Sequence, residues 1–226
     1  MKEFFLKKIK PASIWFFKSF IWLALLIFII DILSKSLVVA NRDYILSSSN
    51  QGLVLIPNFL AINYVINTGA AFGLSAGDSE AGFIVNRIIY IIIATLAIGG
   101  LIFFYCKKYA SIKKYYKACI MLIIAGAFGN LVDRIFYTPS YLGSAHNGVV
   151  DWINFFGIWG YNFNIADSAL VIGVIMTIIY LIIEEVRNSR ANKAKFKKDN
   201  TAISSKVENV EAPSKEEITK DNKKEE

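Results

Sequence analysis

The sequence predicts an all-α membrane protein with four transmembrane helices, a small extracytoplasmic β-sheet and both termini in the cytoplasm. Hydrophobic residues make up 55% of the 226 residues, above the roughly 45–50% that is usual for soluble domains. Four apolar segments are long enough to cross the hydrocarbon core of a bilayer, which takes about 20 helical residues. The formal net charge of +7 gathers at the ends of these segments, so we expect no nucleic-acid partner.

The four predicted spans cover residues 14–39, 83–105, 118–135 and 163–183. The first is longer than the apolar core of a signal peptide and no small-residue cleavage pattern follows it, so we expect it to be retained. Lys and Arg concentrate before the first span, between the second and third, and after the fourth, whereas 41–82 carries only Arg42 and 136–162 carries neither. Because cytoplasmic segments are enriched in positive charge, these two segments are predicted to lie outside.

The outer segment 41–82 is too long and too apolar for a simple connector. Within it, residues 52–66 form two β-rich runs separated by Pro57-Asn58, which predicts a small hairpin or sheet resting on the membrane. Residues 187–226 are rich in Lys, Glu, Ser and Asn, and too few are apolar to offset the entropy of ordering. We therefore expect a membrane domain over 1–186 and a disordered, charged cytoplasmic tail over 187–226.

The reactive side chains other than carboxylates are few. Cys106 and Cys119 have no CxxC partner and no His, Asp or Glu at ligand spacing, and His146 is the single histidine. A disulfide framework and a zinc site are therefore not expected, and a single histidine leaves few ways to build a His-dependent metal site. A Ser-His-Asp arrangement would depend on one loop residue. Hydrolytic chemistry in this chain would have to rest mainly on carboxylates.

Ionisable residues inside predicted spans need a partner or a purpose, because their insertion costs a few kcal/mol. Asp31 and Lys35 are four residues apart on one helix, the spacing of a neutralising pair. Either could instead position a substrate or a lipid. Asp133 and Arg134, near the end of the third span, predict a structural ion pair with Asp31 or with another span.

One face of the third predicted span carries Gly126, Gly129, Asn130 and Asp133, which fall at i, i+3, i+4 and i+7. Close helix packing alone explains the two glycines, because small residues let helices approach. Asn130 can donate and accept hydrogen bonds across helices.

Two aspartates outside the middle of the spans are the candidates for chemistry. Asn164 is a candidate N-cap with Asp167 at the third helical position, where a carboxylate bonds back to the cap. Asp151, taken alone, is explained by a turn or a helix cap. The predicted topology places both at the same outer level of the membrane. Two carboxylates in a partly desolvated site cannot both ionise, so they could share a proton and activate water against an amide.

Five blocks carry these polar residues in a fixed order. They are Asp31-Ile-Leu-Ser-Lys35, Asn67-Thr-Gly-Ala-Ala-Phe-Gly73, Gly126-Ala-Phe-Gly-Asn-Leu-Val-Asp-Arg134, Val149-Val-Asp-Trp-Ile153 and Phe163-Asn-Ile-Ala-Asp-Ser168. Together they resemble the lipoprotein signal peptidase family, also called signal peptidase II. The resemblance covers the chain from about residue 20 to residue 183.

This resemblance implies an intramembrane aspartic endopeptidase that removes signal peptides from diacylglyceryl-modified bacterial prolipoproteins, cleaving just before the lipidated cysteine. It implies a monomer in the bacterial cytoplasmic (inner) membrane, among membrane lipids, with its active site at the extracytoplasmic face and without a metal or cofactor. The family's catalytic pair falls on Asp151 and Asp167. Its supporting positions, which contact substrate or hold the pair, fall on Asp31, Lys35, Asn67, Gly69, Asn130, Arg134, Asn164 and Ala166.

Two departures from the family pattern are a somewhat extended segment between Arg134 and Asp151 and the charged tail after Asn188. Neither touches a motif, so they bear on regulation or partners.

From the residues alone, two other classes of function stay open. A small transporter or channel could use membrane-embedded Asp, Asn and Arg along an ion pathway. A structural membrane subunit could pack through Gly126 and Gly129, but it would leave Asp151 and the Asn67 block without a reason.

Overall fold

The computed structural model describes residues 13–50, 52–69, 79–137, 148–155, 158 and 160–211. Four helices in this part of the chain are long and apolar enough to cross a membrane, which confirms the four predicted spans. They are α2 (Ile21–Ala40), α4 (Glu80–Lys108), α5 (Lys114–Phe136) and α6 (Ile165–Glu211). The protein is therefore a multi-pass membrane protein.

The first span begins later than the sequence predicts. Residues 13–19 are helical, but Phe20 has a left-handed backbone with φ of 57°, and α2 starts at Ile21. A left-handed bulky residue interrupts a helix, because its Cβ crowds the following carbonyl. The fully buried Ser19 beside this break accepts a hydrogen bond on its carbonyl oxygen from the Tyr105 hydroxyl. This bond ties the start of the span to α4.

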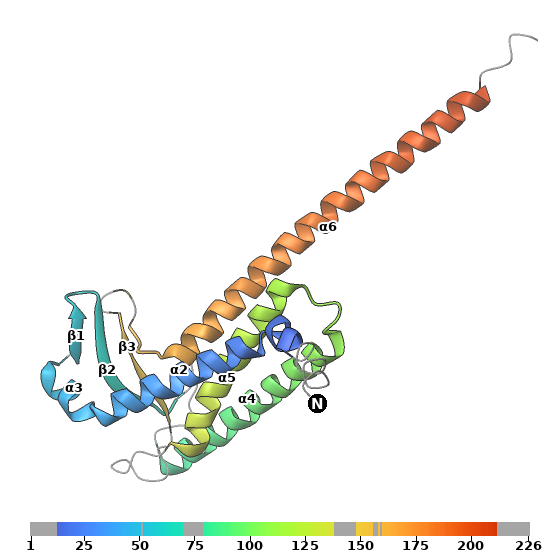
Figure 1. Cartoon of the computed structure of the whole chain (residues 1–226). Helices are drawn as coiled ribbons and strands as arrows, with labels where there is room; N and C mark the ends of the chain where they lie inside the picture. The colour runs from blue at the N-terminus through green and yellow to red at the C-terminus, as the bar shows by residue number, and fades with distance from the viewer. Residues whose placement is uncertain are drawn as a thin grey trace, which may run out of the picture. The chain divides into compact units, whose positions relative to one another are not determined.

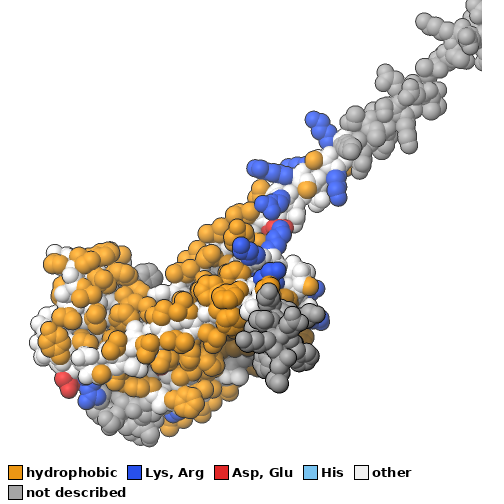
Figure 2. Space-filling model, in the orientation of Figure 1, with side chains coloured by type: hydrophobic (Ala, Val, Ile, Leu, Met, Phe, Trp, Pro, Cys, Tyr) orange, Lys and Arg blue, Asp and Glu red, His pale blue; other side chains and the backbone are white. Residues whose placement is uncertain are grey.

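Helix α5 is the central helix. In its most apolar stretch 44% of the residues are buried, against 11–17% for the other three candidate spans. Large apolar side chains of α2, α4 and α6 are exposed, and Figure 2 shows them covering the surface of these helices. This distribution is expected of helices that present an apolar surface to lipid and a polar or small-residue surface to their neighbours.

A three-stranded antiparallel sheet and a short helix adjoin the end of α2 (Figure 1). The strands are β1 (Leu53–Ile56), β2 (Leu60–Asn67) and β3 (Val149–Asn154), in the order β1-β2-β3, and the helix is α3 (Arg42–Ser48). The predicted pair of β-rich runs is confirmed, and Asn58 in the turn between them has φ of 57°. Val38, Ile45, Tyr64 and Val150 form the core between α2, α3 and the sheet.

The third strand corrects the local interpretation of Asp151. This residue lies in β3 opposite Val65 of β2, and not in a turn or a helix cap. The run from Val149 to Ile153 contains four β-branched or aromatic side chains, which favour a strand once a partner is available. Because that partner is more than 80 residues away in the sequence, local sequence cannot reveal the pairing.

The helix α6 continues to Glu211, which differs from the disorder predicted for residues 187–226. Neither Gly nor Pro occurs between residues 174 and 211, and Lys, Arg, Glu and Ala have high helix propensities. The chain divides into two compact units, Met1–Ile178 and Ile179–Glu226, and every candidate site residue belongs to the first. The end of the predicted tail, residues 212–226, lies outside the described residues.

Candidate active site

Asp151 is a buried carboxylate held by two amides. Only 2% of the residue is exposed. Its Oδ2 accepts a hydrogen bond from Asn67 Nδ2 at 3.0 Å, and its Oδ1 accepts one from Asn164 Nδ2 at 2.8 Å. The pairing of β2 with β3 brings Asn67 beside Asp151, because Asn67 lies opposite Val149. Neutral donors thus orient the carboxylate without adding charge.

Asp167 lies in the first turn of α6 and forms a capping box with Asn164. The Asn164 Oδ1 accepts from the Asp167 backbone N–H at 2.8 Å, and the Asp167 Oδ2 accepts from the Asn164 backbone N–H at 3.2 Å. This reciprocal pair of bonds confirms the predicted N-cap. The other oxygen, Asp167 Oδ1, accepts from Asn130 Nδ2 of α5 at 2.7 Å. The Asp167 carboxylate is therefore oriented by the capping box at the start of α6 and by Asn130 of α5.

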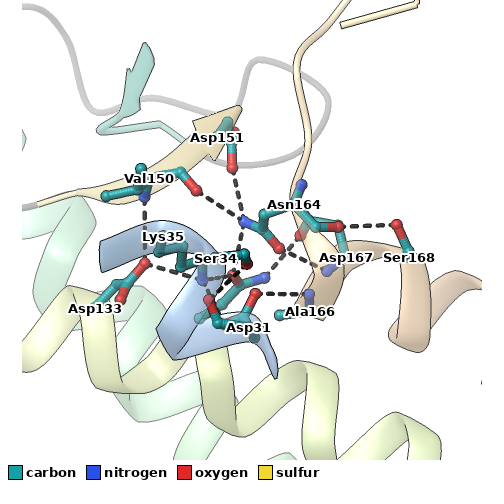
Figure 3. Close-up of polar contacts among 11 residues, drawn as sticks. Asp31, Ser34, Lys35, Asp133, Val150, Asp151, Asn164, Ala166, Asp167 and Ser168 are labelled. Atoms are coloured by element: carbon teal, nitrogen blue, oxygen red, sulfur yellow. Dashed lines mark hydrogen bonds and ion pairs between the residues drawn. The ribbon is translucent and has the colours of Figure 1, made fainter. Parts of the chain in front are cut away.

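Asn164 connects the two aspartates. It is fully buried, and its Nδ2 contacts Asp151 Oδ1 while its Oδ1 accepts from Asp167 (Figure 3). The same Nδ2 lies 3.2 Å from Asn130 Oδ1 and 3.3 Å from the Val150 carbonyl oxygen. Asp151 on a strand and Asp167 on a helix are thereby brought into one polar cluster.

The pKa of Asp151 is raised from 3.8 to about 7, chiefly by burial and also by the negative charge of Asp167. The hydrogen bonds from Asn67 and Asn164 and the charge of Lys35 act in the opposite direction and limit this rise. Desolvation disfavours the ionised carboxylate, and a second carboxylate nearby does the same. Near neutral pH this carboxyl group is therefore poised to hold or release a proton.

A buried ion-pair cluster lies beside the aspartates. Lys35 Nζ is 2.7 Å from Asp31 Oδ2 and 3.0 Å from Asp133 Oδ2. The predicted Asp31–Lys35 pair is thus present, and Asp133 pairs with another span, as predicted. Lys35 also donates to Asn130 Oδ1 at 3.3 Å, and Asp31 Oδ1 accepts from the Ala166 backbone N–H at 2.9 Å.

Arg134 joins the loop after β2 to the helices. Its Nη2 donates to the Gly69 carbonyl oxygen at 3.1 Å, and its guanidinium lies 4.7 Å from the centre of the Tyr90 ring. Gly69 in turn donates its N–H to Asn67 Oδ1 at 3.1 Å. Within the part of the chain that the structure describes, Arg134 makes these contacts instead of the predicted ion pair. Tyr90 was not named from the sequence, since an aromatic residue in an apolar span has no distinguishing signal.

The two glycines of α5 allow the close approach on which the cluster depends. A Cβ on Gly126 would overlap the Ala166 carbonyl oxygen, and one on Gly129 would lie 2.6 Å from Asp31 Oδ2. The predicted packing role of these glycines is confirmed. Gly129 also makes room for the carboxylate that caps α6.

The structure brings together all ten candidate residues, which lie on α2, α5, β3, the end of β2 with the residues that follow it, and the start of α6. Cys106 is exposed at the end of α4, and Cys119 is buried in α5. His146 and residues 70–73 of the Asn67 block lie outside the described residues. No group of three or more His, Cys, Asp or Glu side chains in the described part of the chain has the arrangement of a metal site.

Comparisons with known proteins identify one family by sequence and similar membrane enzymes by structure. Residues 23–183 match the sequence model of the family described as signal peptidase (SPase) II. A curated lipoprotein signal peptidase of Fusobacterium nucleatum is 34% identical over 176 residues, which cover 78% of this chain and 91% of that protein. A bacterial membrane enzyme solved by the in meso method at 2.3 Å has 30% identity and a TM-score of 0.57, over 73% of this chain and 88% of its own. A second such structure, at 1.9 Å, has 31% identity and a TM-score of 0.51, over 71% and 90%.

Proposed function

Because this chain belongs to the signal peptidase II family, whose members remove signal peptides from prolipoproteins, we propose that it is an intramembrane endopeptidase of the aspartic type. Asp151 and Asp167 are its catalytic pair. The substrate is a bacterial prolipoprotein carrying diacylglyceryl on a cysteine, and the cut falls just before that cysteine. Family membership argues against the transporter or channel alternative.

The observation that carries this proposal is the shared environment of the two carboxylates. Each accepts a hydrogen bond from an asparagine side-chain amide, and Asn164 donates to both, through its Nδ2 to Asp151 and through its backbone N–H to Asp167. The pKa of Asp151 is raised to about 7 by burial and by Asp167. Two carboxylates that cannot both ionise comfortably share one proton, which is the condition that acid–base hydrolysis by an aspartic pair requires.

In the proposed mechanism the deprotonated member of the pair takes a proton from a water molecule, which attacks the scissile carbonyl carbon. The protonated member donates a hydrogen bond to the carbonyl oxygen, and a proton returns to the amine as it leaves. No covalent intermediate forms. The pair titrates as a unit, so the shared proton belongs to both residues rather than to one. Asn67, Asn130 and Asn164 hold the carboxylates through the cycle.

The other supporting residues act through the surroundings of the pair. Arg134 holds the backbone at Gly69, and Gly69 holds Asn67. We assign Asn67 and Gly69, at the end of β2 and just after it, to the side of the site that contacts the substrate. The diacylglyceryl chains of the substrate lie in lipid against the exposed apolar faces of the helices. The enzyme acts as a monomer and needs no metal or cofactor.

The proposed location is the bacterial cytoplasmic membrane, with both termini inside and the catalytic pair at the extracytoplasmic face. Support comes from the distribution of Lys and Arg, which are abundant on the predicted cytoplasmic segments and nearly absent from 41–82 and 136–162. A site at the membrane surface gives the reaction access to water while the lipid anchor of the substrate stays in the bilayer.

The direct test is cleavage in vitro by the purified full chain in detergent micelles. The substrate is a synthetic signal peptide that continues through a diacylglyceryl-modified cysteine, and mass spectrometry locates the cut. We expect a product that begins with the lipidated cysteine, in buffer containing a metal chelator. The matched control is the same peptide without the lipid, which we expect to be cleaved much more slowly. Absence of any cleavage of the lipidated peptide by folded protein would reject the proposed function.

A further inference from the structure

The cluster of Lys35, Asp31 and Asp133 contacts the backbone beside both catalytic candidates. Lys35 is 3% exposed, and its Nζ lies between Asp31 Oδ2 at 2.7 Å and Asp133 Oδ2 at 3.0 Å (Figure 3). Asp31 and Asp133 come from different helices, α2 and α5. One ammonium group therefore joins two buried carboxylates from two spans.

Each of these carboxylates also accepts a hydrogen bond from a backbone N–H. Asp31 Oδ1 accepts from Ala166, the residue before Asp167, at 2.9 Å. Asp133 Oδ2 accepts from Val150, the residue before Asp151, at 3.2 Å. The two ends of the cluster thus hold the chain one residue before each member of the catalytic pair.

The separation of the pair is not fixed by secondary structure alone. Asp151 lies on a strand and Asp167 on a helix, and two such elements can shift relative to one another without losing their own backbone hydrogen bonds. The chain of contacts from Val150 through Asp133, Lys35 and Asp31 to Ala166 opposes such a shift. A buried ion pair is short and directional, and breaking it leaves an uncompensated charge, so the link is stiff.

We propose that Asp133 is a positioning residue, which acts through Lys35 and Asp31 to set the separation between the carboxylates of Asp151 and Asp167. The inference rests on the proposed function, because it assumes that these carboxylates do the chemistry. Asp133 lies outside the set of supporting residues named above, and in this proposal Asp31 and Lys35 transmit its effect to the backbone at Ala166. Asp133 itself does not touch the substrate.

The test substitutes Asp133→Asn in the full-length protein. An asparagine side-chain oxygen can still accept from the Val150 N–H but cannot neutralise Lys35. We expect kcat per folded molecule to fall on the order of 10–100-fold, because misplacement of reacting groups by about 1 Å has effects of this size. KM should stay within about threefold, since substrate binding is untouched. The matched control is Asp43→Asn, the same substitution at a carboxylate whose side chain is 91% exposed, with unchanged kcat expected.

Two further measurements separate positioning from general destabilisation. If the three residues act as a unit, Lys35→Met combined with Asp133→Asn should lower kcat little more than the more harmful single change does. Hydrogen exchange should accelerate at the Val150 and Ala166 amides of Asp133→Asn and stay unchanged in the Tyr105–Met121 region of α4 and α5. Tyr105→Phe, which removes a buried hydrogen bond far from the site, should lower thermal stability at wild-type kcat.

Wild-type kcat in Asp133→Asn, or additive effects in the double variant, would overturn the positioning role. If Asp133→Asn does not fold, hydrogen exchange in the wild-type protein provides the test. Protection of the Val150 and Ala166 amides supports the chain of contacts through Asp133, Lys35 and Asp31. Exchange as fast as in an unfolded chain rejects it. These amide measurements do not depend on catalysis. Cleavage by Asp151→Asn would instead refute the catalytic pair, whatever the amides show.

Discussion

At the scale of single residues, the Asp151 carboxylate is buried away from water, accepts hydrogen bonds from two side-chain amides and is repelled by the charge of Asp167. A side chain in this position is unfavourable for folding when it is ionised, because two hydrogen bonds do not replace full hydration and Asp167 repels its charge. Such a cost is commonly found where a carboxyl group serves chemistry rather than stability.

Replacing either aspartate by asparagine should abolish processing and leave the fold intact. Asn is close in shape to Asp and can still accept one hydrogen bond, but it cannot take a proton from water. We expect cleavage of the lipidated peptide to fall by on the order of 10³-fold or more in Asp151→Asn and in Asp167→Asn. Both variants should be recovered from the membrane in wild-type amounts.

The controls for this prediction are Cys106→Ala, Cys119→Ala and His146→Ala, which should keep their cleavage activity. Near-normal turnover by a folded Asp151→Asn or Asp167→Asn protein would rule out the proposed pair. Loss of activity in a folded Cys or His variant would point to thiol or histidine catalysis.

The pKa of Asp151 predicts how stability changes with pH. Its value in the folded protein, about 7, lies above the ordinary value of 3.8, so the folded state binds the proton more tightly than the unfolded state does. The contribution of this group is therefore fully present below about pH 4 and is lost as the pH rises through 7. Between pH 5 and pH 8, the thermal midpoint of the wild type should fall relative to that of Asp151→Asn. Parallel midpoints over this interval would show that the group titrates normally.

Much of the site could be predicted from the sequence where the signal is local. The spacing of Asn164 and Asp167 predicts their capping box, and the spacing of Asp31 and Lys35 predicts their ion pair. The contact between Asn67 and Asp151 could not be derived in this way, because it follows from pairing of strands far apart in the sequence. Only the family resemblance placed Asn67 in the site.

At the scale of secondary-structure elements, the site depends on how closely α5 approaches α2 and the start of α6. Gly129 lies at this junction, and a Cβ there would meet Asp31 Oδ2 at 2.6 Å and Ala166 Cβ at 3.0 Å. Neither neighbour can move freely, since Asp31 is bonded to Lys35 and to the Ala166 N–H. Helix packing and site geometry are therefore coupled at one glycine.

Gly129→Ala should lower both stability and activity. We expect a loss of about 1–3 kcal/mol from overpacking, together with a fall in kcat because the cap of α6 is displaced. Thermal unfolding in detergent and the peptide assay measure the two effects. The control is Gly99→Ala in α4, where an added Cβ has no atom within 4 Å and alanine favours the helix. Equal behaviour of the two variants would show that α5 can move away at no cost.

The elements themselves were predictable to different degrees for physical reasons. The four spans follow from apolar segments whose length matches a bilayer, and β1 and β2 follow from two runs that Pro57-Asn58 separates. The ends of spans are less certain from sequence, as the break at Phe20 shows, because apolar residues continue through it. The helix from residue 187 to Glu211 differs from the disorder that its composition predicts, because the Lys, Arg, Glu and Ala residues of this segment also have high helix propensity.

At the scale of the whole molecule, charge distribution and site position make a joint prediction. The Lys and Arg residues that flank the spans lie next to Cys106 at the end of α4 and follow the apolar part of α6, where Figure 2 shows them on the helix surface. The sheet and α3 lie at the opposite end of α2 from the break at Phe20. If positive charge marks the cytoplasmic side, we expect the sheet, Asp151 and Asp167 to lie at the opposite side of the membrane.

Cysteine labelling in intact cells tests this orientation. In a Cys119→Ala background, a membrane-impermeant maleimide should not reach the exposed Cys106 until the membrane is permeabilised. A Tyr44→Cys substitution in a Cys106→Ala, Cys119→Ala background should be labelled at once, because Tyr44 is 63% exposed on α3. The reverse pattern would place the termini outside and the proposed catalytic pair on the cytoplasmic side. That arrangement would contradict the proposed removal of signal peptides at the extracytoplasmic surface, even if the purified enzyme cleaved its substrate.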